Sequence, residues 1–136
     1  METTALICDY AEERQGKLYI MGAGWDYAIA DRPMSMALAI VVHVPWNETN
    51  KPHELRVELL TQDGVPVDVN GSPVLILGKV EMGRPPGSTE GTTFGVPLAV
   101  RIPVLSLAAG TYAFTISVDG TVTSSLPFKM LTMPGS

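Results

Sequence analysis

Residues 110–120, "GTYAFTISVDG", alternate between large apolar and small side chains and then end in a turn signal. Successive side chains of a strand point to opposite faces, so the large apolar set shares one face: Tyr112, Phe114, Ile116 and Val118. The Asp-Gly pair at 119–120 favours the tight turn that returns a strand into a hairpin. This pattern predicts a sheet with one buried face, and it is incompatible with an amphipathic helix.

The same alternation recurs along the chain. In "HELRVELLTQDG", residues 53–64, Leu55, Val57 and Leu59 are predicted to face inward, and an Asp-Gly turn follows at 63–64. In "FGVPLAVRIPV", residues 94–104, Pro97 and Pro103 cannot donate ladder hydrogen bonds, which predicts an edge strand or a broken one. Further strands are predicted at 4–10, 17–22, 36–44, 73–82 and 122–132.

Only "DYAEERQG", residues 9–16, offers a helical possibility, and it is one short turn. About eight short strands in 136 residues predict an all-β fold, an antiparallel β-sandwich of immunoglobulin-like or C2-like architecture. The sequence shows no internal repeat and no domain boundary, so residues 1–136 are predicted to form one domain. The longest predicted loop, 83–95, is rich in glycine and proline.

Composition excludes several classes of protein. With 46% hydrophobic and 17% charged residues, the chain is not of the disordered class. A net charge of −5 argues against nucleic acid or an anionic membrane as the main partner. The start lacks the features of a signal peptide, and the longest apolar run, 36–44, is too short to span a bilayer. We therefore expect a cytoplasmic protein.

The motifs of catalysis and metal binding are sparse. Cys8, the single cysteine, alternates with Leu6 and Tyr10 in a predicted strand, which favours buried packing. Neither histidine adjoins a nucleophile-elbow sequence, and "GAGW", residues 22–25, has no helix after it to hold a phosphate. The aspartates form no dense cluster of calcium-binding type. We predict a non-enzymatic protein with no metal site and no cofactor.

Both histidines flank the segment "PWNETNKP", residues 45–52, which we interpret as a hairpin loop between strands 36–44 and 53–61. The apolar residues lie at even positions in 36–44 and at odd positions in 53–61. If the two strands pair with their apolar residues on one face, His43 and His53 lie on opposite faces of the hairpin. That arrangement argues against a metal pair. The triplet 47–49 matches a glycosylation acceptor, and we interpret it as a chance match.

Strand 36–44 is unusual because its second face is also mostly small and apolar, at Ala37, Ala39, Val41 and His43. An outer sandwich strand normally shows polar residues there. Either a loop of the same chain, such as 83–95, covers this face, or a partner does. These four residues are the predicted interface.

Aromatic residues in loops are the other candidates for binding. Trp25 and Trp46 are each placed either to recognise a sugar or a protein, or to close one end of the sandwich. The predicted recognition loop comprises Trp46, Asn47, Thr49 and Asn50, with Trp25 as a second aromatic. For Trp46 we favour recognition, because a tryptophan at a loop entrance has little strand on which to bury itself.

Several segments resemble an uncharacterised family of small β-sandwich proteins from actinobacteria and their phages. They span most of the chain: "ALICDYAEERQGKLYIMGAGW", "VPWNETNKPHELRVELLTQDG", "MGRPPG", "GTYAFTISVDG" and "LPFKM". The resemblance implies a small stand-alone domain without an assigned activity. It transfers no functional residues.

We therefore expect a non-enzymatic domain that acts through protein–protein contacts. It would be a homo-oligomer or an accessory part of a larger assembly, and the resemblance implies that it can be a component of a phage particle. The alternative is a carbohydrate-binding module that uses Trp25 and Trp46, and a third expectation is a small hydrolase with an unrecognised site.

Overall fold

The computed structural model describes residues 1–134, which form β-strands, connecting loops and one short 3₁₀ turn, η1 (Trp46–Glu48). The strands in chain order are β1 (Glu2–Cys8), β2 (Tyr10–Arg14), β3 (Lys17–Met21), β4 (Tyr27–Ile29), β5 (Met34–Pro45), β6 (His53–Thr61), β7 (Asp68–Val69), β8 (Ser72–Pro73), β9 (Leu75–Val80), β10 (Thr93–Leu105), β11 (Gly110–Val118) and β12 (Thr121–Leu131).

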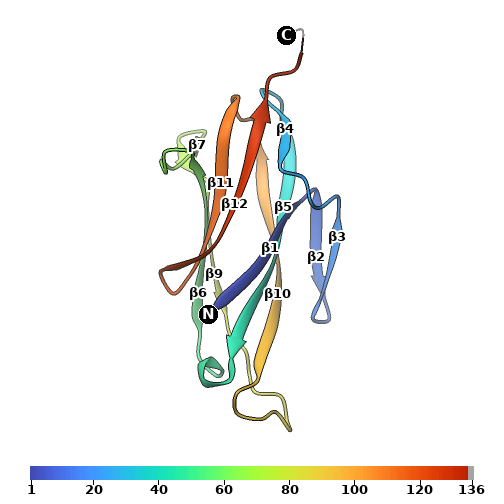
Figure 1. Ribbon diagram of the computed structural model, residues 1–136, viewed down its shortest axis with the longest axis vertical. Coiled ribbons are helices and arrows are strands. Elements are labelled where there is room, and N and C mark those ends of the chain that lie inside the picture. The colour runs from blue at the N-terminus through green and yellow to red at the C-terminus, as the bar shows by residue number, and fades with distance from the viewer. Residues whose placement is uncertain (135–136) are drawn as a thin grey trace.

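Two sheets contain most of these strands. One has three strands in the order β1-β5-β10, and the other has five in the order β4-β12-β11-β6-β9. Neighbouring strands pair antiparallel except β4 and β12, which run parallel. The β2–β3 and β7–β8 hairpins form two small additional sheets. In Figure 1 the long strands of both sheets run along the vertical axis, and the β2–β3 hairpin projects at one side.

The hydrophobic core lies between the two sheets. From β5, the inward side chains of Leu38, Ile40, Val42 and Val44 are fully buried. The facing sheet contributes a stack of aromatic rings, in which the centroid of Phe128 lies 5.4 Å from that of Phe114 and 5.7 Å from that of Tyr112. Period-two alternation on both sheets thus supplies one shared core.

The sheets meet along one side, where β1 lies against β12. The Thr3 hydroxyl donates to Thr123 Oγ1 at 2.9 Å, and Ser124 Oγ donates to the Thr3 carbonyl at 3.2 Å. The five-stranded sheet curls into a half-barrel. The prediction of an all-β, antiparallel fold is confirmed, whereas a simple two-layer sandwich of about eight strands does not describe the curled sheet.

Several predicted local features are confirmed. Leu55, Val57 and Leu59 are buried, and the turn at 119–120 joins β11 to β12 with positive φ at both of its residues. β10 is an edge strand, and its register shifts between Ile102 and Leu105, next to Pro103.

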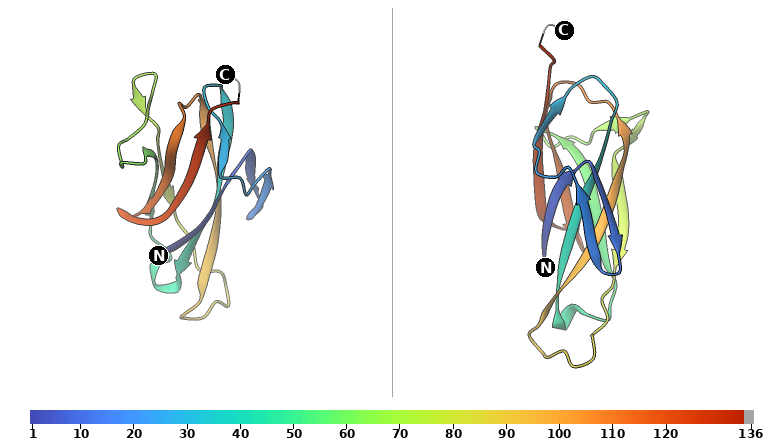
Figure 2. Two further views of the ribbon diagram at one scale, coloured as in Figure 1. Left: turned by 45° about the horizontal axis from the view of Figure 1, so that its top comes forward. Right: turned by 90° about the vertical axis from the view of Figure 1, so that its right-hand side faces the viewer.

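The one helical possibility, around 9–16, is not realised. Tyr10–Arg14 is β2, and it pairs with β3 through a tight turn at Gln15 and Gly16. Both turn residues have positive φ, which matches the primed turns that favour hairpins. The hairpin projects from the body of the molecule (Figure 2), and its Glu13 and Arg14 are exposed.

The predicted hairpin between 36–44 and 53–61 is also wrong, because β5 and β6 belong to different sheets. β5 occupies the centre of its sheet, where it forms ladders with both β1 and β10. The segment 45–52 therefore crosses from one sheet to the other at one end of the molecule. Among the described residues, no helix is long or apolar enough to cross a membrane.

Candidate interaction surfaces

The outer face of β5 is covered over its first half by the β2–β3 hairpin of the same chain. Ala37 and Ala39 are 2% and 4% exposed, and they form a small apolar cluster with Cys8 and Ala11. The prediction of a partner interface at Ala37 and Ala39 is therefore wrong, since short side chains here let the hairpin lie directly on the sheet. The 83–95 loop, proposed as a cover, lies at the far end instead (Figure 1).

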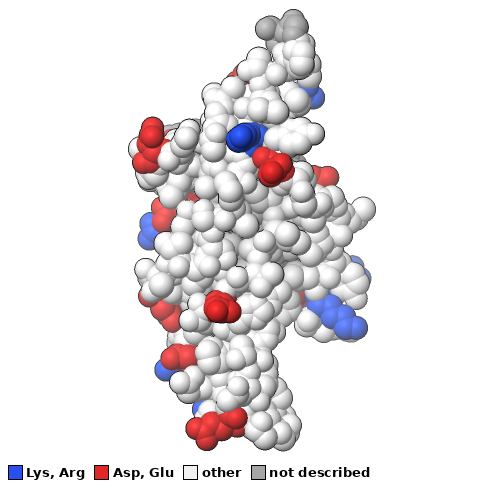
Figure 3. All heavy atoms as spheres, viewed as in Figure 1, with Lys and Arg blue, Asp and Glu red and all other residues white. Residues whose placement is uncertain are grey.

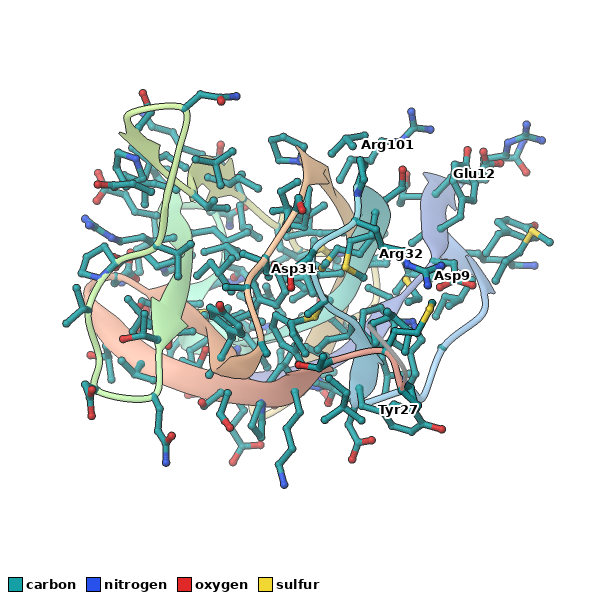
Figure 4. All side chains as sticks on the ribbon, turned by 90° about the horizontal axis from the view of Figure 1, so that it is seen from above. Asp9, Glu12, Tyr27, Asp31, Arg32 and Arg101 are labelled. Carbon is teal, nitrogen blue, oxygen red and sulfur yellow. The ribbon has the colours of Figure 1, made fainter. Side chains whose placement is uncertain are left out.

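A polar network holds the hairpin against the neighbouring strand β10. Arg101 Nη2 donates to the Tyr10 hydroxyl at 2.9 Å, and that hydroxyl donates to Glu12 Oε2 at 2.9 Å. The guanidinium carbon of Arg101 also lies 5.0 Å from the centroid of the Tyr10 ring. Figure 4 labels Arg101 and Glu12 on the two elements that this network joins. One tyrosine therefore latches the hairpin through both its ring and its hydroxyl.

The second half of the same face extends beyond the hairpin. Val41 and His43 are half-buried there, and the β-ladders place Thr4 and Pro97 on either side of Val41. His43 Nε2 lies 2.8 Å from Thr4 Oγ1. These two residues are the part of the predicted interface that still reaches the surface, although the area is small.

The recognition loop predicted at 46–50 forms the η1 turn, and an arginine from another loop covers its tryptophan. The guanidinium carbon of Arg84 lies 3.4 Å from the centroid of the Trp46 ring. Arg84 Nε donates to Thr49 Oγ1 at 2.7 Å, and its Nη2 donates to the Trp46 carbonyl at 3.2 Å. The buried Thr49 hydroxyl donates to that carbonyl as well, at 2.6 Å. One face of the indole is thus occupied by a cation–π contact.

The remaining loop candidates do not form one site with Trp46. Asn47 and Asn50 are exposed, and the Asn50 amide donates to the Met82 carbonyl at 2.8 Å. Trp25 is half-buried, packs on the core and lies edge-on to Phe128, with ring centroids 6.3 Å apart. The segment before β4 and the η1 turn lie at opposite ends of the molecule (Figure 1), so the two tryptophans are not brought together.

His53 is 2% exposed and both of its ring nitrogens are engaged. Nδ1 lies 2.6 Å from Asp119 Oδ2, and Nε2 lies 2.7 Å from the Glu48 carbonyl oxygen. Burial lowers the pKa of His53, but the bond to Glu48 and the bond and charge of Asp119 outweigh burial and raise that pKa above its usual value. The hydrogen bond from His53, followed by that from the Glu54 amide, lowers the pKa of Asp119.

This arrangement serves structure better than catalysis. A histidine that acts as a general base needs one ring nitrogen free to reach a substrate, and neither nitrogen of His53 is free. Burial, followed by the charge of Asp9, raises the pKa of the Cys8 thiol and keeps it from the reactive thiolate form. Within residues 1–134, no group of three metal-ligating side chains gathers.

The edge strands of a sheet present main-chain groups without a ladder partner. The two main sheets have four edge strands, and three of these are protected against pairing. β1 lies against β12 through Thr3, and β4 is three residues long. β10 carries Pro97 and Pro103, each at an odd position. Because proline has no N–H group, the hydrogen bonds from β10 to β5 around Pro97 must come from the N–H groups of the even positions. Pro97 therefore removes a donor from the outer edge, and Pro103 lies in the register shift that interrupts this strand, so edge-to-edge pairing is hindered.

The fourth edge, β9, lacks these features. Leu59 N donates to the Val74 carbonyl at 3.2 Å, and Val57 pairs with Ile76, so the even positions of β9 face β6. The N–H and C=O groups of Leu75, Leu77 and Lys79 therefore point away from the sheet. Leu77 is 67% exposed. In Figure 2 the yellow-green strand β9 lies at the rim of the molecule.

A shallow groove of about 460 Å³ adjoins this edge on the outer face of the five-stranded sheet. Its lining comes from β6, β9 and the β11–β12 turn: Glu54, Leu55, Arg56, Leu77, Gly78, Lys79 and Gly120. The groove and the unpaired edge together form a candidate surface, which we call the β9 edge, defined by Leu75, Leu77 and Lys79.

Sequence reasoning predicted the strand 73–82 but not its exposure. The segment "VLILGKV", residues 74–80, is apolar at both parities, which resembles a strand covered on both faces. Charge does not mark the surface either. On the face shown in Figure 3, charged groups are scattered among uncharged residues and form no large patch of one sign.

A curled all-β fold with buried histidine and cysteine side chains in structural contacts defines the class as a small all-β domain. The chain belongs to a family of unknown function, DUF6941, whose model matches residues 3–131. This confirms membership of an uncharacterised family, as the resemblance implied. A search of curated proteins finds no match.

Proposed function

We propose that the chain is a non-enzymatic binding domain that joins another protein chain by strand addition, as part of a larger assembly. The unguarded β9 edge carries this proposal. Its outward N–H and C=O groups can be satisfied by an added strand, which is a general mode of peptide recognition. Leu77 supplies an apolar contact for that strand, since its side chain is largely exposed in this structure.

The contrast with the other edges supports the proposal. Natural β-proteins protect their edges against unwanted pairing by covering, shortening or adding proline and charge. This chain does so at β1, β4 and β10, whereas β9 has no proline, and Lys79 is its one protecting charge. An edge left open beside three protected ones is expected where pairing is used.

Site-specific photo-crosslinking in the native host tests this function. A photoreactive benzoyl-phenylalanine at position 79 should capture a protein chain, and fragment mass spectrometry should place the adduct on an extended segment of that chain. The same group at Val122, a 60% exposed residue on β12, is the matched control. Equal cross-linking from positions 79 and 122 would argue against a binding edge.

A carbohydrate-binding module is the second candidate, and one observation favours it. A hollow of about 230 Å³ lies beside Trp46, lined by Pro45, Asn47, Glu90 and Gly91. Polar side chains next to an indole suit a saccharide, although Arg84 already covers one ring face. A glycan array probed with the wild type and with Trp46→Ala tests this candidate, since binding that survives the substitution would exclude the hollow.

Two more specific expectations from the sequence remain predictions. These are the immunoglobulin-like or C2-like architecture, and occurrence in actinobacteria and their phages as an accessory component. A binding domain without a reactive site is compatible with such a role.

A further inference from the structure

We infer that the strand added at the β9 edge is β9 of a second copy, in a two-fold symmetric dimer that joins the two five-stranded sheets. This inference rests on the proposed function and specifies its partner. The β9 edge is compatible with its own copy in antiparallel register. With Leu77 on the two-fold axis, Leu77 faces its counterpart and Lys79 faces Leu75 of the other copy, so each facing pair exchanges both main-chain hydrogen bonds.

The side chains on the outer face favour this register. Directly opposed apolar residues stabilise a strand pair, and opposed like charges destabilise it. Pairing about Leu77 brings two exposed leucines together and sets the two Lys79 side chains apart. A register centred on Lys79 would instead oppose two ammonium groups, so the charge on this edge selects against that alternative.

Charge complementarity across the new pair adds to this selection. Within one chain, Glu58 on β6 is the cross-strand neighbour of Leu75. In the dimer, Lys79 of one copy lies opposite Leu75 of the other copy. Glu58 of that other copy lies on the next strand, on the far side of Leu75. A lysine side chain is long enough to extend over a leucine toward that carboxylate. Within one chain Lys79 also has Glu54 as its cross-strand neighbour, and Glu58 Oε1 lies 2.7 Å from Arg56 Nε. The dimer therefore places each Lys79 between Glu54 of its own chain and Glu58 of the other.

The test introduces a charged side chain at position 77, on the two-fold axis, and measures the mass of the assembly by light scattering. The wild type should show twice the 14.5 kDa of one chain at micromolar concentration. Leu77→Lys and Leu77→Glu should each give a folded monomer, because each places like charges opposite one another on the axis. An equimolar mixture of the two variants should regain the dimer mass, since only their heterodimer opposes Lys to Glu.

Val122→Lys is the control, because Val122 is similarly exposed but lies on β12. It should remain dimeric, and thermal melts should show all three variants folded. A monomeric wild type, or a dimer that both Leu77 variants leave intact, would overturn the inference. Either result leaves the proposed function to its cross-linking test, where an adduct with a different protein would support strand addition and exclude a second copy as the partner.

Discussion

His53 and Asp119 lie 66 residues apart in the chain, yet Nδ1 of the first is 2.6 Å from Oδ2 of the second. The other ring nitrogen faces the Glu48 carbonyl oxygen. A carbonyl and an ionised carboxylate only accept hydrogen bonds, so this arrangement favours the imidazolium form, in which both ring nitrogens donate, and it raises the pKa of His53. The pair thereby ties the η1 turn to the β11–β12 turn across the end of the core.

Stability should depend on pH through this pair. The pKa of His53 is raised on folding, so its stabilisation is fully present below the usual histidine value of about 6.5 and is lost as pH rises through the folded pKa. The pKa of Asp119 is lowered, so its contribution is present above about 4 and is lost as pH falls through the folded pKa. The window in which both act lies between these values.

Urea denaturation at a series of pH values measures this effect. The free energy of unfolding of the wild type should fall on the alkaline side of the window, whereas His53→Gln should lower it throughout and remove that fall. His43→Gln alters the only other histidine and should retain the wild-type profile. If the alkaline loss persists in His53→Gln, another group is responsible.

The second prediction concerns Trp46 and Arg84. Trp46→Ala should lower the free energy of unfolding by about 3 kcal/mol, because it removes a large, half-buried ring. Arg84→Ala should cost about 1–2 kcal/mol through the lost cation–π contact and the hydrogen bonds to Thr49 and the Trp46 carbonyl. Arg84→Lys should recover only part of this loss, since lysine lacks the planar fork.

A double-mutant cycle measured by denaturant melts checks whether the two residues act together. Coupling of about 1 kcal/mol between Trp46→Ala and Arg84→Ala is expected for residues in direct contact. A stable Trp46→Ala variant that has lost a ligand would instead identify the indole as a recognition residue.

Local alternation predicted most strands because it reports which face of a strand is buried. Partner choice was harder to predict. β5 and β6 are neighbours along the chain and resemble a hairpin, but β5 pairs with β1 and β10 in the other sheet. Residues 9–16 offered one short helical turn, whereas Gln15 and Gly16 with positive φ close a β-hairpin there.

The candidate sites depended even more on tertiary contacts. The small, apolar outer face of β5 was visible in the sequence, and a cover within the same chain was one of two open alternatives. The covering segment could not be identified, because nothing in residues 10–21 shows that the hairpin folds back over Ala37 and Ala39. The contact of Arg84 with Trp46 spans two loops and has no signature in either.

The third prediction contrasts two residues on the outer face of β5. Ala39→Arg should lower the free energy of unfolding by about 3 kcal/mol, because a long charged side chain is forced beneath the β2–β3 hairpin. Val41→Arg lies two positions along the same face, beyond the hairpin and half-exposed, and should cost less than about 1 kcal/mol. Thermal and denaturant melts measure both. Equal losses would show that the hairpin does not cover Ala39 in solution.

The last prediction concerns the latch at Tyr10. Tyr10→Phe keeps the ring that contacts Arg101 but removes the hydroxyl that accepts from Arg101 and donates to Glu12. Exposed hydrogen bonds contribute little to global stability, so the free energy of unfolding should change by less than about 1 kcal/mol. The hairpin itself should open more often, since local openings are governed by local contacts. Hydrogen exchange should therefore quicken in residues 10–21 and stay unchanged in β11.

Tyr19→Phe, on the exposed side of β3, should leave exchange as in the wild type. Faster exchange in all segments alike would mean that the hydroxyl supports the whole fold, and the hairpin would then not be an independently opening cover of the β5 face.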